Sequence, residues 1–262
     1  MPEPQILFDD GAAYERYMGR WSQLAGDVFL DWLAPEKGLR WLDVGCGNGA
    51  FTEMLFERCV PAAIDGVDPS AAQLAFARTR PAAKLARFHQ GDAMALPFPE
   101  DAFDVAVMPL VIFFVPDPAQ GVAEMARVVR AGGTVAAYGW DLTEGGFPYT
   151  ALQAEMRAMG IAPGMPPSPQ AARIDVLQDL WRGAGLDAIE TRAIEVERTF
   201  DDFEDWWTTV LTGPSVSAKL AAMTPDDRAA LKDRMRAHHP ADAAGRVTYG
   251  ARANAVKGRV PR

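Results

Sequence analysis

An acidic residue and three glycines alternate with other residues in one short stretch: Asp43, Gly45, Gly47 and Gly49. Glycine accepts positive φ and lets a ligand approach bare backbone, which is typical of loops that bind nucleotides between a strand and a helix. The run from Gly45 to Ala50 also fits the spacing of the dinucleotide fingerprint. The stretch therefore predicts a ligand site, and its spacing alone leaves the ligand open.

A second acidic residue, Asp68, follows nineteen residues after Gly49, at the end of the next apolar run. A carboxylate at the end of the second strand of a nucleotide-binding fold can accept hydrogen bonds from ribose hydroxyls. Dinucleotide-binding proteins and proteins that bind other adenosine-containing cofactors both need such a residue. Asp68 therefore supports a nucleotide site without deciding between the two classes.

These residues need strands to position them, and the chain alternates β-branched runs with segments of helical periodicity. This alternation is typical of a parallel sheet with helices on its faces. The expected strands cover 39–44, 62–67, 86–90, 103–108, 134–140, 186–197 and 246–257. Helices are expected after the glycine loop, from Ser70, from Asp117 through Val129 to Gly132 and Gly133, over 149–159, around 177–184, over 200–211 and from Thr224.

The composition is that of a globular protein, with 262 residues of which 49% are hydrophobic and 23% are charged. This balance excludes a disordered chain and a coiled coil. The 35 acidic and 26 basic residues give a net charge of -9, which repels phosphate backbones and anionic lipid headgroups. We therefore expect neither nucleic acid nor a membrane as a partner.

The first five residues have neither the basic nor the apolar region of a secretory signal. The longest apolar run, 105–115, is interrupted by Pro109 and is too short to cross a bilayer, which needs about 20 residues. We therefore expect a cytoplasmic protein. Cys46 and Cys59 have no Cys-x-x-Cys or zinc-ligand spacing, so we expect packed thiols and no metal site.

Four separated blocks resemble the class I S-adenosylmethionine-dependent methyltransferases, particularly the small-molecule group similar to ubiquinone and menaquinone biosynthesis enzymes, known as methyltransferase type 11. The blocks are the glycine loop with Asp43, the residue Asp68, the run Gly91–Phe98, and the stretch from Phe103 to Gly133. A dehydrogenase has no reason to carry the last two blocks. The resemblance covers residues 12–140 well and the remainder only in layout.

The resemblance implies an α/β fold with a Rossmann-like seven-stranded sheet whose last strand is antiparallel, with helices on both faces. It also implies an N-terminal helical lid and an insertion after strand five. We expect a single domain over 1–262. Its parts are an N-terminal helical segment (1–38), a cofactor-binding half (39–140), the insertion (141–170) and a C-terminal half (171–262).

The resemblance further implies that S-adenosylmethionine is the cofactor and S-adenosylhomocysteine the product. The methionine part would lie against Asp43, Gly45, Cys46, Gly47, Asn48 and Gly49; the ribose would bind Asp68 beside Pro69; the adenine would bind Asp92 and Ala93; and Leu110 would line the sulfonium region. Tyr17 and Arg20 lie in a segment that resembles the N-terminal helix of such enzymes, where they would reach the cofactor carboxylate. The alternative for that segment is a surface helix packed on the sheet.

The acceptor pocket is expected under the insertion 141–170 and the aromatic helix 200–211, over Tyr138 and Trp140. In open α/β sheets the ligand crevice lies beyond the carboxyl ends of the strands, and the insertion begins where strand five ends. In the helix, Trp206 and Trp207 either belong to the core or contact the acceptor, because adjacent helical side chains point about 100° apart.

A general base is less well defined, because many relatives carry a histidine shortly after strand four and this chain has the apolar run Val111–Val115 there. His89, at the end of the third expected strand, is the remaining candidate, and a structural role suits it better. The predicted function is methyl transfer to a small, partly apolar acceptor. The alternatives are a catalytically inactive S-adenosylmethionine-binding regulatory or scaffold module and a nicotinamide-dependent dehydrogenase; the oligomeric state stays open.

Overall fold

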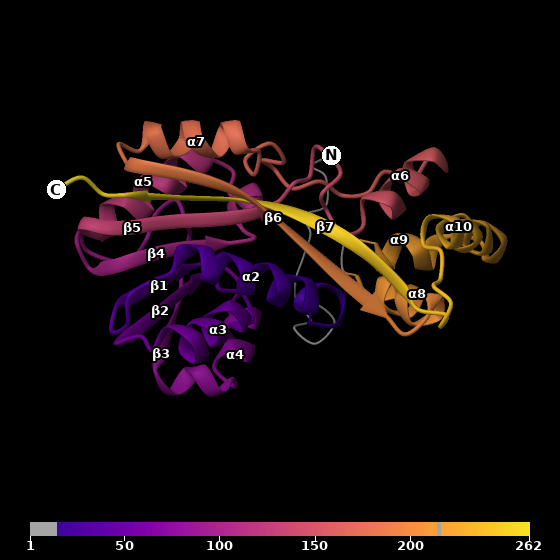
Figure 1. Ribbon diagram of the computed structural model, residues 1–262, viewed down its shortest axis with the longest axis horizontal. Coiled ribbons are helices and arrows are strands. Elements are labelled where there is room, and N and C mark those ends of the chain that lie inside the picture. The colour runs from indigo at the N-terminus through magenta and orange to yellow at the C-terminus, as the bar shows by residue number, and fades with distance from the viewer. Residues whose placement is uncertain (1–14, 214–215) are drawn as a thin grey trace.

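The computed structural model describes residues 15–213 and 216–262. Within them the strands form one seven-stranded sheet in the order β3-β2-β1-β4-β5-β7-β6 (Figure 1). Its strands are β1 (Arg40–Val44), β2 (Ala63–Asp68), β3 (Ala86–Gln90), β4 (Phe103–Pro109), β5 (Val129–Trp140), β6 (Asp187–Phe200) and β7 (Val247–Arg259). Strands β1 to β5 pair in parallel, and β7 is antiparallel to both β5 and β6. The predicted sheet with an antiparallel last strand is confirmed.

Helices cover both faces of the sheet (Figure 1). On one face lie α2 (Arg20–Leu33), α3 (Ala50–Cys59) and α4 (Ala71–Ala77), and on the other α5 (Pro118–Val128) and α7 (Ile174–Gly183). The predicted caps are confirmed at two of these helices, because the side chain of Ser70 accepts a hydrogen bond from the Gln73 N–H and that of Asp117 from the Gln120 N–H. These two helices, α4 and α5, each follow the carboxyl end of a strand, β2 and β4 respectively.

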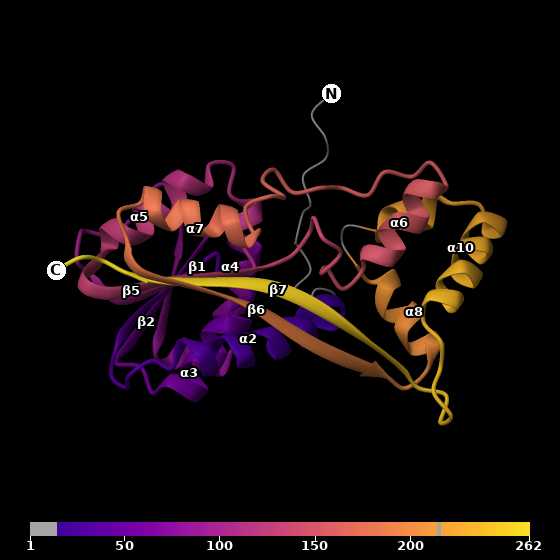
Figure 2. The same cartoon turned by 45° about the horizontal axis from the view of Figure 1, so that its top comes forward.

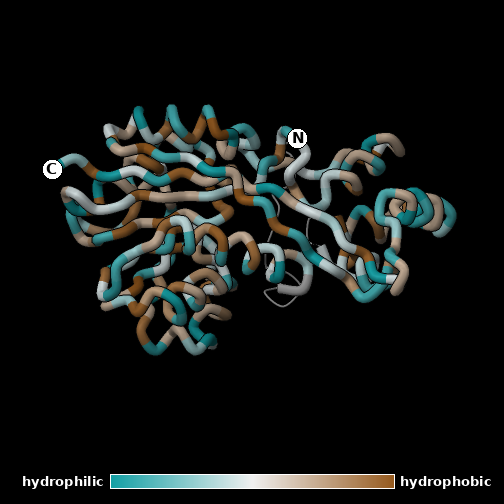
Figure 3. Tube along the Cα trace, in the orientation of Figure 1, coloured by the Kyte–Doolittle hydropathy of each residue, from teal (hydrophilic) through white to brown (hydrophobic). Residues whose placement is uncertain are grey.

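A second group of helices lies beyond the sheet, at the far end of the long β6–β7 pair (Figure 2). It consists of α6 (Thr150–Ala158), α8 (Phe203–Leu211), α9 (Ser217–Ala222) and α10 (Pro225–His238). Lys232 on α10 forms an ion pair with Glu204 on α8, and Arg234 with Glu155 on α6. Figure 3 shows α10 as mostly hydrophilic, which agrees with a helix that buries only one side. We call α6, α8, α9 and α10 the helical cluster.

Three short helical segments complete the described chain: η1 (Glu15–Gly19), η2 (Pro81–Lys84) and η3 (Ile112–Phe114). Among residues 15–213 and 216–262, no helix has both the length and the apolar character needed to cross a bilayer. The expected cytoplasmic location and the single-domain organisation stay predictions.

The predicted end of the fourth-strand helix is wrong. Helical spacing includes Val129, but α5 ends at Val128 and Val129 pairs with Phe103 as the first residue of β5. The glycines that were expected to end the helix lie inside this strand, where the register shifts next to Phe103. A Cβ at Gly133 would stand 2.4 Å from the Val129 side chain and 2.7 Å from the Asp104 carbonyl oxygen, so the close strand pairing requires glycine.

Candidate functional site

A cavity of about 950 Å³ opens at the carboxyl ends of β1, β2 and β4. This volume is at the upper end of the range of roughly 300–1,000 Å³ for small-molecule sites. Its described lining comes from the start of α2, the glycine loop and α3, the ends of β2 and β3, the exit of β4, and the insertion. The cavity lies where open α/β sheets bind their ligands.

The glycine loop between β1 and α3 holds its shape through backbone hydrogen bonds to β2. The N–H groups of Gly45 and Cys46 donate to the Val67 carbonyl at 2.7 and 3.0 Å. Gly45 has a φ of 74°, and a Cβ there would stand 2.5 Å from the Val111 side chain. Gly47 also has positive φ, but its nearest neighbour in that direction is 4.0 Å away. The backbone at Gly47 is therefore open toward the cavity.

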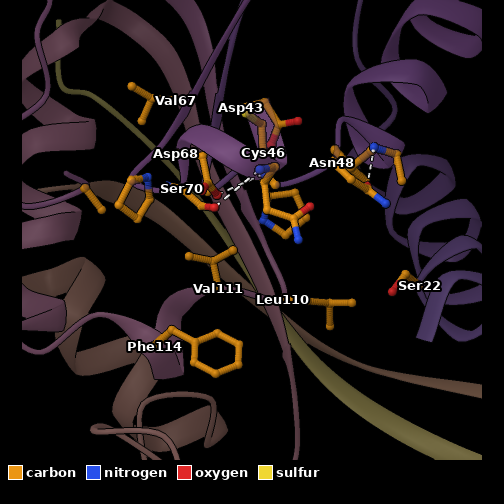
Figure 4. Close-up of a pocket in the computed structure, with 18 of the residues that line it drawn as sticks. Ser22, Asp43, Cys46, Asn48, Val67, Asp68, Ser70, Leu110, Val111 and Phe114 are labelled. Carbon is orange, nitrogen blue, oxygen red and sulfur yellow. Dashed lines mark hydrogen bonds between the residues drawn. The ribbon is translucent and has the colours of Figure 1, made fainter. Parts of the chain in front are cut away.

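Asp43 is fully buried at the end of β1, and its side chain lines the cavity (Figure 4). The Thr52 hydroxyl donates to its Oδ2 at 2.7 Å, and its Oδ1 has no hydrogen-bond partner among the described residues. Burial, and to a smaller degree the charge of Asp68, raise the pKa of Asp43 to about 7, although the Thr52 hydrogen bond opposes the shift. Asp43 thus carries a buried oxygen without a partner among the described residues, in a residue that lines the cavity.

Asp68, at the end of β2, connects the glycine loop to the next helix. Its Oδ2 accepts from the Gly47 N–H at 3.0 Å and its Oδ1 from the Ser70 N–H at 2.8 Å (Figure 4). Burial raises the pKa of the carboxyl, and these two hydrogen bonds oppose the shift. A carboxylate has about four lone-pair positions, so Asp68 can accept further hydrogen bonds from ligand hydroxyls.

Asp92 follows β3, is exposed, and lines the same cavity together with Ala93 and Pro69. Its Oδ1 accepts from the Met94 N–H at 2.8 Å, which fixes the side chain in a local turn. The structure thus brings Asp43, Asp68 and Asp92 to one cavity although they are far apart in the chain.

The wall of the cavity beyond β4 is apolar. It is lined by Val111, Phe114, Val115 and Pro116, and by Met165, Pro166 and Pro167 of the insertion. Leu110 begins this wall with a φ of 60°, and its N–H donates to the Tyr138 carbonyl at 2.7 Å. Positive φ is uncommon for leucine, and such strained residues cluster at functional sites. In Figure 4, Phe114 lies farther from the glycine loop than Val111, whose side chain packs against Gly45.

The insertion is anchored on both sides of the residues that reach the cavity. The Ser168 N–H donates to the Phe113 carbonyl at 3.0 Å, and its hydroxyl donates to the Val115 carbonyl at 2.8 Å. On the other side, the Lys219 ammonium on α9 donates to the Ala162 carbonyl. We call residues 162–167 the insertion loop; it spans from the helical cluster to η3.

Several predicted cofactor residues line the cavity, and others do not. The lining includes Asp43, Gly45, Cys46, Gly47, Asn48, Asp68, Pro69, Asp92, Ala93 and Leu110. Gly49 is not part of the cavity lining, and a Cβ at this position would contact Ala77 and the Arg80 side chain. Tyr17 is buried and stacks on Tyr149 with ring centroids 4.2 Å apart, while Arg20 is exposed and donates to the Gln23 side chain. The structure therefore places the last two side chains away from the cavity lining.

Of the predicted acceptor residues, Tyr138 lines the cavity and the three tryptophans lie outside it. Trp206 is fully buried, donates to the Tyr249 hydroxyl at 3.0 Å and packs at a tilt against His239, with ring centroids 4.4 Å apart. Trp207 and Trp140 are also buried. The aromatic helix, α8, therefore packs against β7 through Trp206 and Tyr249, and against α10 through Phe203 and Arg236.

His89 lies outside the cavity lining. Its Nε2 is 2.7 Å from Oδ1 of Asp65, and its ring packs edge-on against Phe98. These contacts give the histidine a structural place between β2 and β3. Among residues 15–213 and 216–262, no cluster of three potential metal ligands is found.

Sequence reasoning missed several lining residues. Ser22 and Gln23 come from α2, Glu53 from α3, Gln73 from α4, Arg80 from the connection after α4, and Phe114 from η3. Glu53 follows the glycine loop by one helical turn, so its position could have been inferred from the motif. Arg80 lies in a connection without a motif, and no sequence signal indicates its role.

The described residues fit an adenosine-containing cofactor. Three carboxyl groups can accept hydrogen bonds from amino and hydroxyl groups, and the buried Oδ1 of Asp43 has no partner among the described residues. The open backbone at Gly47 allows close approach of a ligand.

Part of the chain is similar to known methyltransferases. Residues 42–137 match a family model described as a methyltransferase domain. The chain is 38% identical over 125 residues to 2-methyl-6-phytyl-1,4-hydroquinone methyltransferase 2 of Oryza sativa, covering 46% of this chain and 35% of that protein. It is 36% identical over 116 residues to demethylmenaquinone methyltransferase of Thermus thermophilus, covering 44% and 51%. The chain thus matches about one third to one half of the length of these relatives.

The fold extends the similarity over nearly the whole chain. The structure of phosphoethanolamine N-methyltransferase 2 of Haemonchus contortus, solved with phosphomonomethylethanolamine and S-adenosylhomocysteine, superposes with a TM-score of 0.60 at 17% identity. The superposition covers 97% of this chain and 58% of that one. At this identity the likeness concerns the fold.

Proposed function

We propose that this chain, a member of the class I S-adenosylmethionine-dependent methyltransferases by its domain and its fold, transfers a methyl group from S-adenosylmethionine to a small, partly apolar acceptor. The observation that carries the proposal is a cavity whose described lining includes the glycine loop, Asp68 and Asp92 together. The two relatives are named as methyltransferases of 2-methyl-6-phytyl-1,4-hydroquinone and of demethylmenaquinone, which supports an acceptor of the small-molecule class.

In the proposed complex the methionine part lies along the glycine loop, Asp68 accepts from the ribose hydroxyls, and Asp92 accepts from the adenine amino group. Asp68 is already oriented by the Gly47 and Ser70 N–H groups, so it need not reorganise when a ligand binds. Leu110 lines the region between the two parts of the cavity.

S-adenosylmethionine supplies an activated methyl group on a sulfonium sulfur, which is a good leaving group. The chain must therefore orient the acceptor and exclude water. The apolar wall from Val111 to Pro116 and the insertion loop suit both tasks. None of the lining residues in these two segments has a side chain that accepts a proton at neutral pH. We infer that the acceptor presents an atom that is already nucleophilic when it binds.

The two alternatives are less well supported. A nicotinamide-dependent dehydrogenase would share the glycine loop and Asp68, but residues 42–137 match the methyltransferase domain. A catalytically inactive binding module would not need the apolar cavity wall beside the glycine loop.

Two measurements test the proposal. Native mass spectrometry of the purified chain should detect S-adenosylmethionine or S-adenosylhomocysteine, and calorimetry should detect binding of both and none of NAD. A methyl-transfer assay should then be run with hydroquinones, phenols and fatty acids as acceptors. NAD binding without S-adenosylhomocysteine binding would support the dehydrogenase. Cofactor binding without transfer to any of these acceptors would support the inactive module.

A side chain at position 47 should weaken cofactor binding. Asparagine tolerates positive φ better than other non-glycine residues, so Gly47→Asn mainly places a side chain in open cavity space. Excluding the ligand from that space should lower S-adenosylhomocysteine affinity about 10-fold by calorimetry, which corresponds to about 1.4 kcal/mol.

Gly38→Asn is the matched control, because Gly38 also has positive φ and open surroundings but lies outside the cavity lining. Both variants should lose a similar, small amount of stability, and only Gly47→Asn should lose affinity. Equal affinities in the two variants would show that the cofactor does not approach Gly47.

Shortening the insertion loop should lower turnover while cofactor affinity and the melting temperature stay nearly unchanged. A variant lacking residues 163–166 keeps Ser168 and its two hydrogen bonds to η3. If the loop instead serves to stabilise the fold, the melting temperature should fall as well. Wild-type turnover with every acceptor would exclude a role for the loop in the reaction.

A milder variant uses Met165→Ala with Leu211→Ala as its control, because the two side chains are exposed to the same degree, 39% and 38%. Only Met165 lines the cavity. Met165→Ala should raise the KM for the acceptor about 3- to 10-fold, as expected for loss of part of an apolar contact. Leu211→Ala should leave it unchanged.

A further inference from the structure

Arg80 lies in the turn between α4 and η2 and reaches back to the glycine loop. Its Nε donates to the Asn48 carbonyl oxygen at 2.7 Å, and its terminal nitrogen donates to Oε2 of Glu53 at 2.7 Å. The Arg80 side chain is 13% exposed and that of Glu53 is 19% exposed. The interaction is therefore largely shielded from water, unlike a surface ion pair.

The contacts of Arg80 fall on the part of the loop that the ligand would use. The Asn48 carbonyl lies between Gly47, whose backbone is open to the cavity, and Gly49, the N-cap residue of α3. Glu53 is in the first turn of α3, and its N–H donates to the Gly49 carbonyl. Arg80 therefore connects the loop to the helix that follows it.

The opposite side of the same loop is held by Asp68, which accepts from the Gly47 N–H. Asp68 and Arg80 thus fix polar backbone groups of two consecutive residues, Gly47 and Asn48. Both side chains come from one unit, residues 68–80, which runs from the end of β2 to the turn after α4. A Cβ at Gly49 would contact Ala77 at 3.0 Å and the Arg80 side chain at 3.4 Å, so this unit also packs closely against the loop. Because glycine has no Cβ, the three glycines of the loop can adopt many backbone conformations unless such contacts restrain them.

We propose that Arg80 is a positioning residue that holds the glycine loop in its ligand-binding conformation through the Asn48 carbonyl and Glu53. The proposal rests on the proposed function where it concerns cofactor affinity, and on the free protein alone where it concerns the loop. Arg80 need not contact the cofactor for this role. The side chain reduces the number of conformations that the free glycine loop adopts, so less conformational entropy is lost when the ligand binds.

Two readouts test the role. In the ligand-free protein, Arg80→Met should speed hydrogen exchange of the amides of residues 47–50 relative to those of β1. In the binding assay, S-adenosylhomocysteine affinity should fall about 10-fold, because binding must then order a glycine loop that Arg80 no longer restrains. The KM for S-adenosylmethionine should rise by a similar factor while kcat at saturation stays within about twofold, since a positioning residue outside the reacting atoms mainly affects binding.

Conservative variants separate geometry from charge. Arg80→Lys keeps the charge but cannot donate to the Asn48 carbonyl and Glu53 in the planar arrangement of a guanidinium, so it should resemble Arg80→Met. Glu53→Gln keeps an acceptor and should have a smaller effect than Glu53→Ala. In a double-mutant cycle, Arg80→Met and Glu53→Ala should be less than additive, because they remove the same interaction.

Arg130→Met is the matched control. Arg130 also pairs with a carboxylate, Asp104 at 2.6 Å, and donates to a carbonyl, but at the opposite end of the sheet. Arg130→Met should leave the affinity for S-adenosylhomocysteine and the hydrogen exchange of the glycine loop unchanged. Unaltered loop exchange in Arg80→Met, or full recovery in Arg80→Lys, would overturn the proposal. If the wild type fails to bind S-adenosylhomocysteine, the proposed function fails, and loop exchange still decides the role of Arg80.

Discussion

Replacing Asp68 by alanine is expected to lower the affinity for S-adenosylhomocysteine about 10- to 150-fold. Hydrogen bonds to charged groups contribute about 1.5–3 kcal/mol each, and each 1.4 kcal/mol is a factor of ten in affinity. The variant also removes the acceptor of the Gly47 and Ser70 N–H groups, so the loop loses a restraint together with the ligand contact. Isothermal calorimetry measures the change directly.

Asp104→Ala is a suitable control for Asp68→Ala. The Asp104 carboxylate accepts from the Arg40 N–H at 2.7 Å and pairs with Arg130 at 2.6 Å, but it lies at the amino end of β4, away from the cavity. Asp104→Ala should lower stability and leave cofactor affinity unchanged. Unchanged affinity in Asp68→Ala would remove the assignment of Asp68 to the ribose.

The second large effect concerns Asp43 and the pH dependence of folding. Its pKa in the folded protein is about 7, whereas an unperturbed aspartate has 3.8. The folded state therefore binds more protons than the unfolded state between these values, so stability is lost as the pH rises from 3.8 through 7. A shift of this size corresponds to about 4 kcal/mol in full, of which about 2–3 kcal/mol should be lost between pH 5 and pH 8.

Asp43→Asn isolates this contribution, because asparagine keeps the shape and can still accept from Thr52 but does not titrate in this range. Urea unfolding of both proteins at pH 5 and pH 8 should show the variant gaining about 2–3 kcal/mol relative to the wild type at the higher pH. Asp68→Ala should reduce the difference, since the charge of Asp68 contributes to raising the pKa of Asp43. Parallel pH profiles of wild type and Asp43→Asn would mean that Asp43 titrates normally.

The sequence predicts the sheet and the glycine loop well because their signals are local. The alternation of strands and helices leads to the correct sheet, and Asp43, Asp68 and Asp92 follow strands whose carboxyl ends must meet. Strand boundaries depend on pairing, which is not local. Val129 has helical spacing from Val122 but belongs to β5, because pairing with Phe103 overrides the helical preference.

Side-chain direction was harder to predict than position. Trp206 and Tyr17 have the size and chemistry of ligand contacts, yet each packs against aromatic residues far away in the chain, Tyr249 and Tyr149. Helical periodicity predicts that a side chain is buried, but it does not predict whether that side chain contacts another part of the core or a bound ligand. For Arg80 the sequence predicts no role, because the residue lies in a connection without a motif. Only the folded chain shows that its side chain reaches the Asn48 carbonyl.

The described lining of the cavity comes from short segments before residue 168, and Lys219 of the helical cluster donates to the Ala162 carbonyl of the insertion loop. The glycine loop, Asp68, Asp92 and the apolar wall from Val111 to Pro116 all lie inside the stretch that matches the methyltransferase domain, whereas the insertion loop lies outside it. In an evolving lineage, changes in the insertion loop could alter the accepted molecule without disturbing the glycine loop. A library randomised at residues 163–167, with Ser168 retained, is therefore a practical starting point for changing acceptor choice in this scaffold.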